Sequence, residues 1–192
     1  MKLIYLLVSI ATLVGVSPWR AEAAAIEGVR FEDRLEVDGI RLHLHGTALL
    51  RYRVFIKGYV VALYLDESFE GPANPQGVLA DTARRLEIEY FWSIGAKDFA
   101  SATIEGIARN TDSAGFERIR PSIEQLNALY EDVEPGDRYA LTYVPGIGTE
   151  LARNGQRLGV IEGAEFSAAL FSIWLGDRPL DESLRNQLLA QN

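Results

Sequence analysis

The chain has 192 residues, of which 48% are hydrophobic and 24% charged, so it can form one domain with a buried core. Lys and Arg number 19 against 27 Asp and Glu, and the formal net charge of -8 opposes binding to nucleic acid. The absence of cysteine and the presence of only 2 histidines exclude thiol catalysis, disulfide scaffolds and zinc clusters. Any metal site would have to be built mostly from carboxylates, and we expect no metal and no cofactor.

The first residues have the pattern of an export signal. Lys2 precedes an apolar run at residues 3–16, which is shorter than the roughly 20 residues that a membrane span needs. Small residues follow at the positions that a signal peptidase requires. We predict a signal peptide at residues 1–25, cleaved after Ala23 or Ala25, and a mature domain at residues 26–192. The protein would then be periplasmic or secreted, without stable membrane insertion; the alternative is an uncleaved N-terminal anchor.

The first half of the mature chain has the alternation typical of strands. Residues 34–46 alternate on either side of Asp38-Gly39, which predicts two strands joined by a tight turn. Residues 54–65 are rich in β-branched and aromatic residues and predict a long strand that is covered on both faces. A loop is expected at residues 66–77, followed by a strand at residues 86–91.

Helices and further strands follow. Apolar residues at helical spacing predict a helix over residues 97–114, which stops at Gly115, and Pro121 predicts the start of a second helix. The remaining elements are a strand at 139–143, a hairpin at Asn154-Gly155, and helices at 166–176 and 180–189. This order of elements predicts an α+β fold, with a mostly antiparallel sheet packed against helices on one side.

The sequence contains no Walker loop, dinucleotide fingerprint or hydrolase elbow. His43 and His45 would share one face of a strand, but no third metal ligand is apparent, and a solvent-facing strand would hold the same residues. Arg51 and Arg53 would share one face of an extended segment, where an arginine suits a carboxylate or a phenolate. An ion pair with a surface carboxylate is the alternative.

Several stretches together resemble the bacterial chalcone isomerase-like proteins. They are Gly28-Val29-Arg30-Phe31 and residues 46–51, 55–65, 145–149 and 166–176. The resemblance keeps one order from about residue 28 to residue 189. It implies an open-faced β-sandwich of the chalcone isomerase type, in which a long antiparallel sheet and a helical layer enclose an apolar cleft.

The resemblance also implies two kinds of activity. The family includes plant chalcone isomerases and non-catalytic relatives that bind fatty acids, and in the enzymes an arginine early in the fold stabilises the anionic substrate. Arg51 matches that arginine, with Arg53 as the alternative. Tyr59 and Ile173-Trp174 stand where the enzymes carry threonine and a substrate-facing residue, which argues against flavanone formation. Their catalytic asparagine and tyrosine have only nearby counterparts, namely Asn110 and Tyr130.

We therefore expect an exported protein that binds a small apolar, anionic ligand such as a fatty acid. Arg51 would pair with the anion, and Tyr59, Tyr64 and Trp174 would line the cleft. The alternative is an isomerase, an intramolecular lyase acting on a chalcone-like enone, with Arg51 as electrophile and Tyr59 as hydrogen-bond donor. A third possibility is an interaction module whose cleft is only core. The oligomeric state does not follow from the sequence.

Overall fold

The computed structural model describes residues 24–52 and 56–190. The strands are β1 (Ala24–Ile26), β2 (Val29–Phe31), β3 (Arg34–Val37), β4 (Ile40–Tyr52), β5 (Ile56–Asp66), β6 (Arg84–Tyr90), β7 (Arg138–Val144), β8 (Gly148–Arg153) and β9 (Gln156–Ile161). The helices are α1 (Pro75–Val78), α2 (Ala96–Asn110), α3 (Ser113–Leu129), α4 (Ala164–Leu175) and α5 (Glu182–Leu189).

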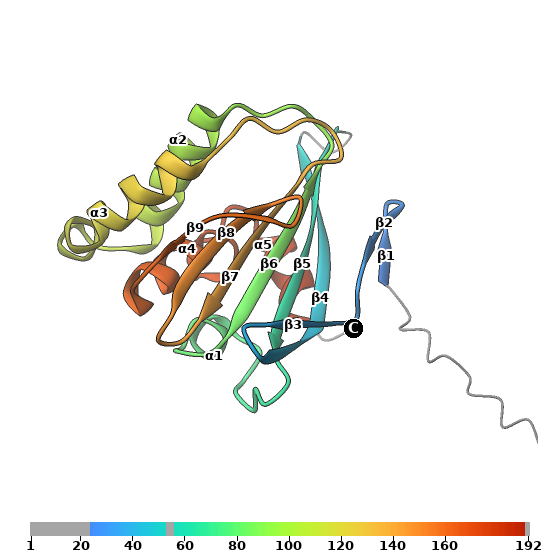
Figure 1. The fold of residues 1–192 in the computed structure, drawn as a ribbon, viewed down its shortest axis with the longest axis horizontal. Coiled ribbons are helices and arrows are strands. Elements are labelled where there is room, and N and C mark those ends of the chain that lie inside the picture. The colour runs from blue at the N-terminus through green and yellow to red at the C-terminus, as the bar shows by residue number, and fades with distance from the viewer. Residues whose placement is uncertain (1–23, 53–55, 191–192) are drawn as a thin grey trace, which may run out of the picture.

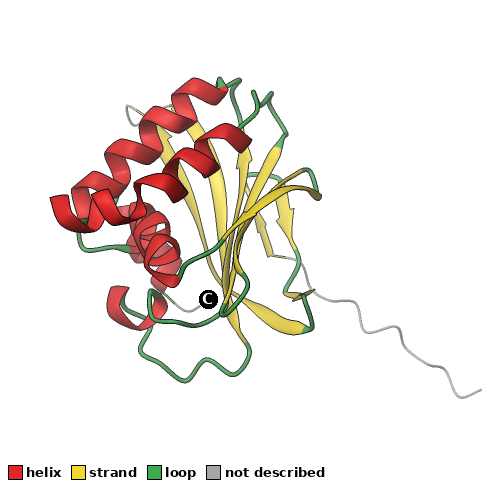
Figure 2. Ribbon diagram, turned by 60° about the vertical axis from the view of Figure 1, so that its left-hand side comes forward, coloured by secondary structure: helices red, strands yellow, loops and turns green. Residues whose placement is uncertain are grey.

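Strands β3 to β9 form a seven-stranded antiparallel sheet in which neighbours in the chain are neighbours in the sheet (Figure 1). The α2–α3 pair is inserted between β6 and β7, and α4 and α5 follow β9. Figure 2 shows these helices on one side of the sheet and the small β1–β2 hairpin on the other. We call the two sides the helix face and the open face. The predicted α+β fold, an open-faced β-sandwich, is confirmed.

Both predicted tight turns are present. Asp38-Gly39 and Asn154-Gly155 have φ angles of 50°, 77°, 51° and 80° in that order, the left-handed conformation that a two-residue hairpin loop requires. The predicted boundary between the first two long helices is wrong. Helix α3 begins at Ser113 with Asp112 as its cap, so Gly115 lies in its first turn and Pro121 lies inside it. The cap and the buried apolar face of α3 offset the backbone hydrogen bond that proline removes.

Strand β5 is covered on both faces, as its composition predicts. Tyr59, Val61, Leu63 and Leu65 belong to the core cluster under the helices. The alternate residues Val60, Ala62 and Tyr64 belong to a second cluster on the open face. All seven are at most 8% exposed. The period of two along a strand thus divides one apolar segment between two separate cores.

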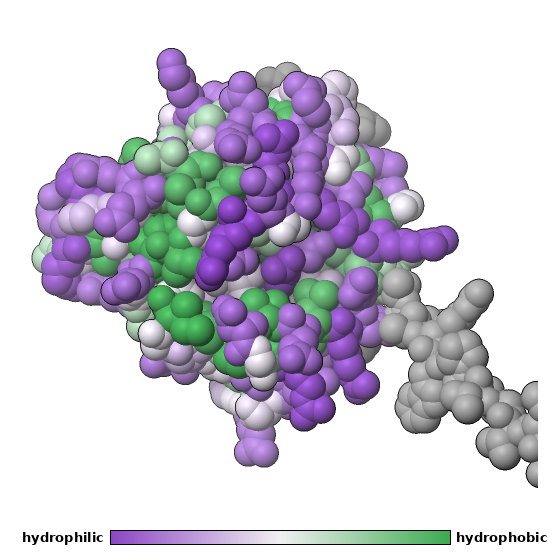
Figure 3. Space-filling model, viewed as in Figure 1, coloured by the Kyte–Doolittle hydropathy of each residue, from purple (hydrophilic) through white to green (hydrophobic). Residues whose placement is uncertain are grey.

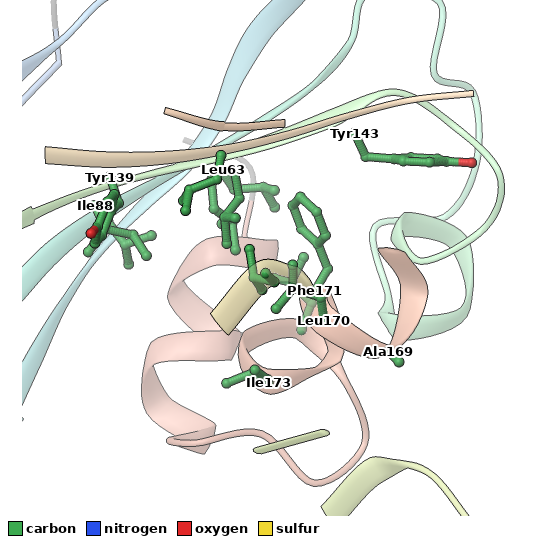
Figure 4. Close-up of a cluster of buried hydrophobic side chains, with 14 of the residues drawn as sticks. Leu63, Ile88, Tyr139, Tyr143, Ala169, Leu170, Phe171 and Ile173 are labelled. Carbon is green, nitrogen blue, oxygen red and sulfur yellow. The ribbon is translucent and has the colours of Figure 1, made fainter. Parts of the chain in front are cut away.

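The helix face carries the larger core. Figure 4 shows Leu63, Ile88 and Tyr139 projecting from the strands toward α4, whose Leu170 and Phe171 point back at the sheet. Two glycines allow helices to approach closely. A Cβ on Gly46 would lie 2.4 Å from the Leu188 carbonyl oxygen of α5. A Cβ on Gly106 of α2 would lie 2.8 Å from the side chain of Ile173 on α4, so this glycine sets how closely α2 packs on α4.

Long charged side chains and the β1–β2 hairpin cover the open face of the sheet. Arg138 donates to Glu87 Oε1 at 2.7 Å and to Glu89 Oε2 at 2.6 Å, and its guanidinium lies 5.0 Å from the ring centre of Phe31. Arg85 donates to Glu87 and to Thr142. Figure 3, which looks onto this face, shows hydrophilic side chains crossing it beside apolar surface. Ion-paired side chains and the hairpin therefore cover the open face of the sheet, as the helices cover the helix face.

Candidate functional site

A cavity of about 300 Å³ lies between the helix face of the sheet and helix α2. Its walls come from the strands (Tyr59, Ile88, Tyr90, Tyr139, Leu141, Leu151), from α2 and the loop before it (Ile94, Asp98, Phe99, Ala102, Thr103, Glu105, Arg109), and from later segments (Tyr130, Ile173, Trp174, Leu180). This volume is at the lower end of the range for small-molecule sites, about 300–1,000 Å³. The cavity is thus large enough for one small ligand.

Aromatic rings form much of the wall. Phe99 of α2 stacks on Tyr130 at a centroid distance of 5.4 Å and meets Tyr90 and Tyr139 edge-on, each at 5.2 Å. Tyr59 also meets Tyr90 edge-on, at 5.8 Å. These large rings fill the space between α2 and the strands only in part, and the cavity lies beside them. The wall is therefore built from packed rings and is predominantly apolar.

Most of the tyrosine hydroxyls in the wall bond to neighbouring groups. Trp174 Nε1 donates to the Tyr59 hydroxyl at 2.9 Å, and the Tyr130 hydroxyl pairs with Thr103 Oγ1 at 2.8 Å. Tyr139 donates to the Glu131 carbonyl and accepts from the Glu131 amide. The Tyr90 hydroxyl has no hydrogen-bond partner within the described part of the chain. Because Tyr59 accepts from Trp174, its own proton remains available to a ligand.

These phenols stay neutral at ordinary pH. Burial raises the pKa of Tyr59, of Tyr90 and of Tyr130 well above the usual tyrosine value. The wall contains neither histidine nor cysteine, and none of its tyrosines is poised to act as a base near neutrality. The interior of the cavity can therefore supply hydrogen-bond donors and apolar contacts, but no compensating charge.

Among the residues that the structure describes, the charged groups that line the cavity all lie on α2. Asp98, Glu105 and Arg109 are exposed and lie on the side of the helix that borders the cavity. Arg109 is the only cation in the wall, and no carboxylate forms an ion pair with it in the residues that the structure describes. Arg109 is therefore the group at this rim that can attract an anion.

The structure brings together two of the four predicted site residues, Tyr59 and Trp174, which line the cavity and are hydrogen-bonded to each other. Arg51 lies at the end of β4 and donates to Glu27 Oε1 at 3.2 Å, so it forms the surface ion pair that the sequence left as the alternative. It does not line the cavity. The alternative match, Arg53, falls outside the described residues.

Tyr64 lies on the open face, five residues after Tyr59 on the same strand. It is fully buried there and borders a hollow with Phe31, Arg85 and Arg138. Arg51 is also on the opposite side of the sheet from Tyr59, because its partner Glu27 lies in the β1–β2 hairpin on the open face. The structure therefore does not bring Arg51 and Tyr59, the electrophile and donor named for the isomerase alternative, together in this cavity.

The other candidates are also placed. Tyr130 lines the cavity, whereas Asn110 donates to the Arg178 carbonyl and accepts from the Arg178 amide, so it fixes the segment after α4. His45 is buried, its ring Nε2 lies 3.3 Å from the Leu189 carbonyl oxygen, and burial lowers its pKa.

Within the described residues no group of three His, Cys, Asp or Glu side chains could hold a metal ion. No helix in the same residues is long and apolar enough to cross a membrane.

An antiparallel sheet with one helix-covered face and a partly open aromatic cavity between the layers defines an open-faced β-sandwich with a site between sheet and helices. A family model described as chalcone isomerase-like matches residues 23–190. The chain belongs to the chalcone isomerase-like family.

A solved structure shares this fold, the crystal structure of a fatty-acid binding protein from Arabidopsis thaliana. The TM-score is 0.68 at 16% sequence identity, and the match covers 88% of this chain and 96% of that one. No curated protein matches the sequence. At this identity the likeness establishes a common fold.

The sequence reasoning missed Tyr90, Phe99, Thr103 and Arg109 as cavity residues. Tyr90 could have been found, because it follows Leu86 and Ile88 on the buried side of an alternating strand. Arg109 carried a weaker signal: it shares a helical stripe with Ala102 and Glu105, but only the packing of α2 over the sheet shows that the stripe borders a cavity.

Proposed function

We propose that this protein binds a small apolar ligand, such as a fatty acid, in the cavity under α2. The observation that carries the proposal is the cavity of about 300 Å³ walled mainly by aromatic and aliphatic side chains. Closed, mostly apolar cavities with a few hydrogen-bond donors are typical of small-molecule sites. The structural relative whose title names it a fatty-acid binding protein supports the same ligand class.

Blocking the cavity tests this function. Ala102 is exposed on α2 and lines the cavity, so Ala102→Phe would place a ring in the volume that the ligand needs. Ala108 is exposed on the same helix but does not line the cavity, so Ala108→Phe is the matched control. Calorimetric titration with decanoic acid should show binding to the wild type and to Ala108→Phe, and a loss of at least about tenfold in affinity for Ala102→Phe.

Two outcomes would contradict binding in this cavity. A wild-type protein that binds neither decanoic acid nor the neutral 1-decanol would have a cavity that is only a packing defect. Equal binding by Ala102→Phe and the wild type would place the ligand elsewhere on the surface.

We also infer that the protein is exported and that cleavage falls after Ala23. Strand β1 begins at Ala24, which pairs with Phe31, while Ala25 pairs with Arg30. Cleavage after Ala23 would keep both pairs, whereas cleavage after Ala25 would remove them. The intact mass of the protein recovered from the periplasm of a bacterial host should correspond to a chain that starts at Ala24. A full-length mass would contradict cleavage, and a chain that starts at Ile26 would contradict this site.

A further inference from the structure

The cavity has a charge asymmetry that restricts how an amphiphilic ligand can lie in it. Among the described residues no charged side chain lines the interior, where the polar groups are the hydroxyls of Tyr59, Tyr90, Tyr130 and Tyr139 together with Thr103. Moving an ionised carboxylate from water into such a site without a counter-charge is costly. An anionic ligand is therefore expected to enter with its apolar end first and to leave its charge at the rim.

The rim itself is divided along α2. Asp98 lies near the start of the helix and Arg109 in its last turn, about 16 Å apart along the axis. Glu105 lies one turn before Arg109. The two carboxylates repel an anion along the part of this edge that precedes Arg109, whereas the guanidinium can accept it in a bidentate, charge-assisted pair. Only the Arg109 end suits an anionic group.

Apolar surface is available beside Arg109. Asn110, the next residue, is hydrogen-bonded to the main chain of Arg178, so the end of α2 lies against the segment that carries Leu180. Leu180 is 42% exposed and lines the same cavity, as does Trp174. These side chains can cover the methylene groups that lie next to a headgroup at the rim.

We propose that Arg109 binds the anionic headgroup of a single-chain amphiphile at the rim of the cavity, with the apolar tail inside. This inference rests on the proposed function and assigns the orientation of the ligand. It also replaces Arg51, which Glu27 already neutralises on the other side of the sheet, as the ligand's counter-charge.

A pair of ligands with the same tail tests the inference. Decanoic acid carries the charge and 1-decanol does not, and each is titrated into the wild type, Arg109→Gln and Arg51→Gln. We expect Arg109→Gln to weaken decanoate binding about fivefold, the scale of an exposed ion pair, and to leave 1-decanol unchanged. Arg51→Gln should change neither affinity. Raising NaCl from 50 to 500 mM should weaken decanoate binding to the wild type, but not to Arg109→Gln.

Several results would overturn the assignment while the proposed function stands. They are binding of 1-decanol without decanoate, a decanoate affinity that Arg109→Gln leaves unchanged, an equal loss for both ligands in Arg109→Gln, and a selective loss of decanoate in Arg51→Gln. Failure of the wild type to bind either ligand would instead remove both the function and the orientation. Arg109→Lys should keep part of the affinity for decanoate, because it keeps the charge and loses only the bidentate geometry.

Discussion

The two faces of the sheet are closed in different ways, although the same strands form both. On the helix face, Tyr59 and its neighbours pack against α2 and α4 and leave a cavity between them. On the open face, Arg85 and Arg138 pair with carboxylates of β6, and the β1–β2 hairpin covers Tyr64. A helical layer held off by large rings can enclose volume for a ligand. A layer of ion-paired side chains seals a sheet but leaves its charges open to salt and pH.

The largest contrast concerns two buried phenylalanines. Phe171 of α4 is fully buried in the helix-face core, and Phe31 of β2 is 1% exposed on the open face. Phe171→Ala should lower the free energy of unfolding by about 3–5 kcal/mol, because it leaves a cavity in a layer that cannot collapse. Phe31→Ala should cost less, about 1–2 kcal/mol, because a two-stranded hairpin can open locally without unfolding the sheet. Urea denaturation of both variants measures the difference.

If Phe31→Ala and Phe171→Ala lower the free energy of unfolding equally, the hairpin and the helical layer unfold as one cooperative unit. A Phe31→Leu variant provides the control, because it keeps an apolar side chain of similar size. Its loss should be smaller than that of Phe31→Ala if burial, and not a specific aromatic contact with Arg138, holds the hairpin.

The second contrast uses two tyrosines of β5. Tyr59→Phe removes the acceptor of the Trp174 indole N–H and should lower the free energy of unfolding by about 1–2 kcal/mol. Tyr64→Phe should change it by less than about 0.5 kcal/mol, because the Tyr64 hydroxyl has no hydrogen-bond partner among the residues described by the structure. Thermal denaturation of the matched pair tests this. A larger loss for Tyr64→Phe would reveal a bond on the open face, for example to water.

These tyrosines also show how far the sequence could be read. Alternation in several strands, the apolar composition of β5, the two hairpin turns and the helix order are local signals, and they were sufficient for the α+β class; the open-faced β-sandwich followed from the family resemblance. The division of Tyr59 and Tyr64 between two faces was also available, because an odd separation along a strand points side chains in opposite directions. Treating both as cleft residues overlooked that rule.

The position of Arg51 could not be predicted in the same way. The strand pairing shifts register between Leu44 and Gly46 and again between Leu50 and Arg51, so a simple alternation does not fix its face. Its partner Glu27 belongs to a separate hairpin, and such contacts between distant parts of the chain leave no local pattern. Arg109 could be assigned only after α2 was packed over the sheet.

The smallest predicted effect is a pH dependence of the contacts on the open face, which the helix face should not share. Glu27 accepts hydrogen bonds from Arg51 and Lys57 and thereby attaches the β1–β2 hairpin to the β4–β5 end of the sheet. The hydrogen bond from Lys57 is the main cause that lowers the pKa of Glu27 in the folded protein. The attachment is therefore complete above the ordinary glutamate pKa of about 4.3 and is lost as the pH falls through the lower folded value.

The indole of Trp92 reports on the titration of Glu27, and the indole of Trp174 serves as the reference. Trp92 donates to the Lys57 carbonyl and borders the same hollow as Glu27, whereas Trp174 lies on the helix face. We expect the indole N–H signal of Trp92 in NMR spectra to shift with a midpoint below about pH 4.3, while that of Trp174 stays constant. Glu27→Gln should abolish the Trp92 transition. A simultaneous shift of both indoles in the wild type would mean that acid loosens the whole domain, and the open face would then not be the pH-sensitive side.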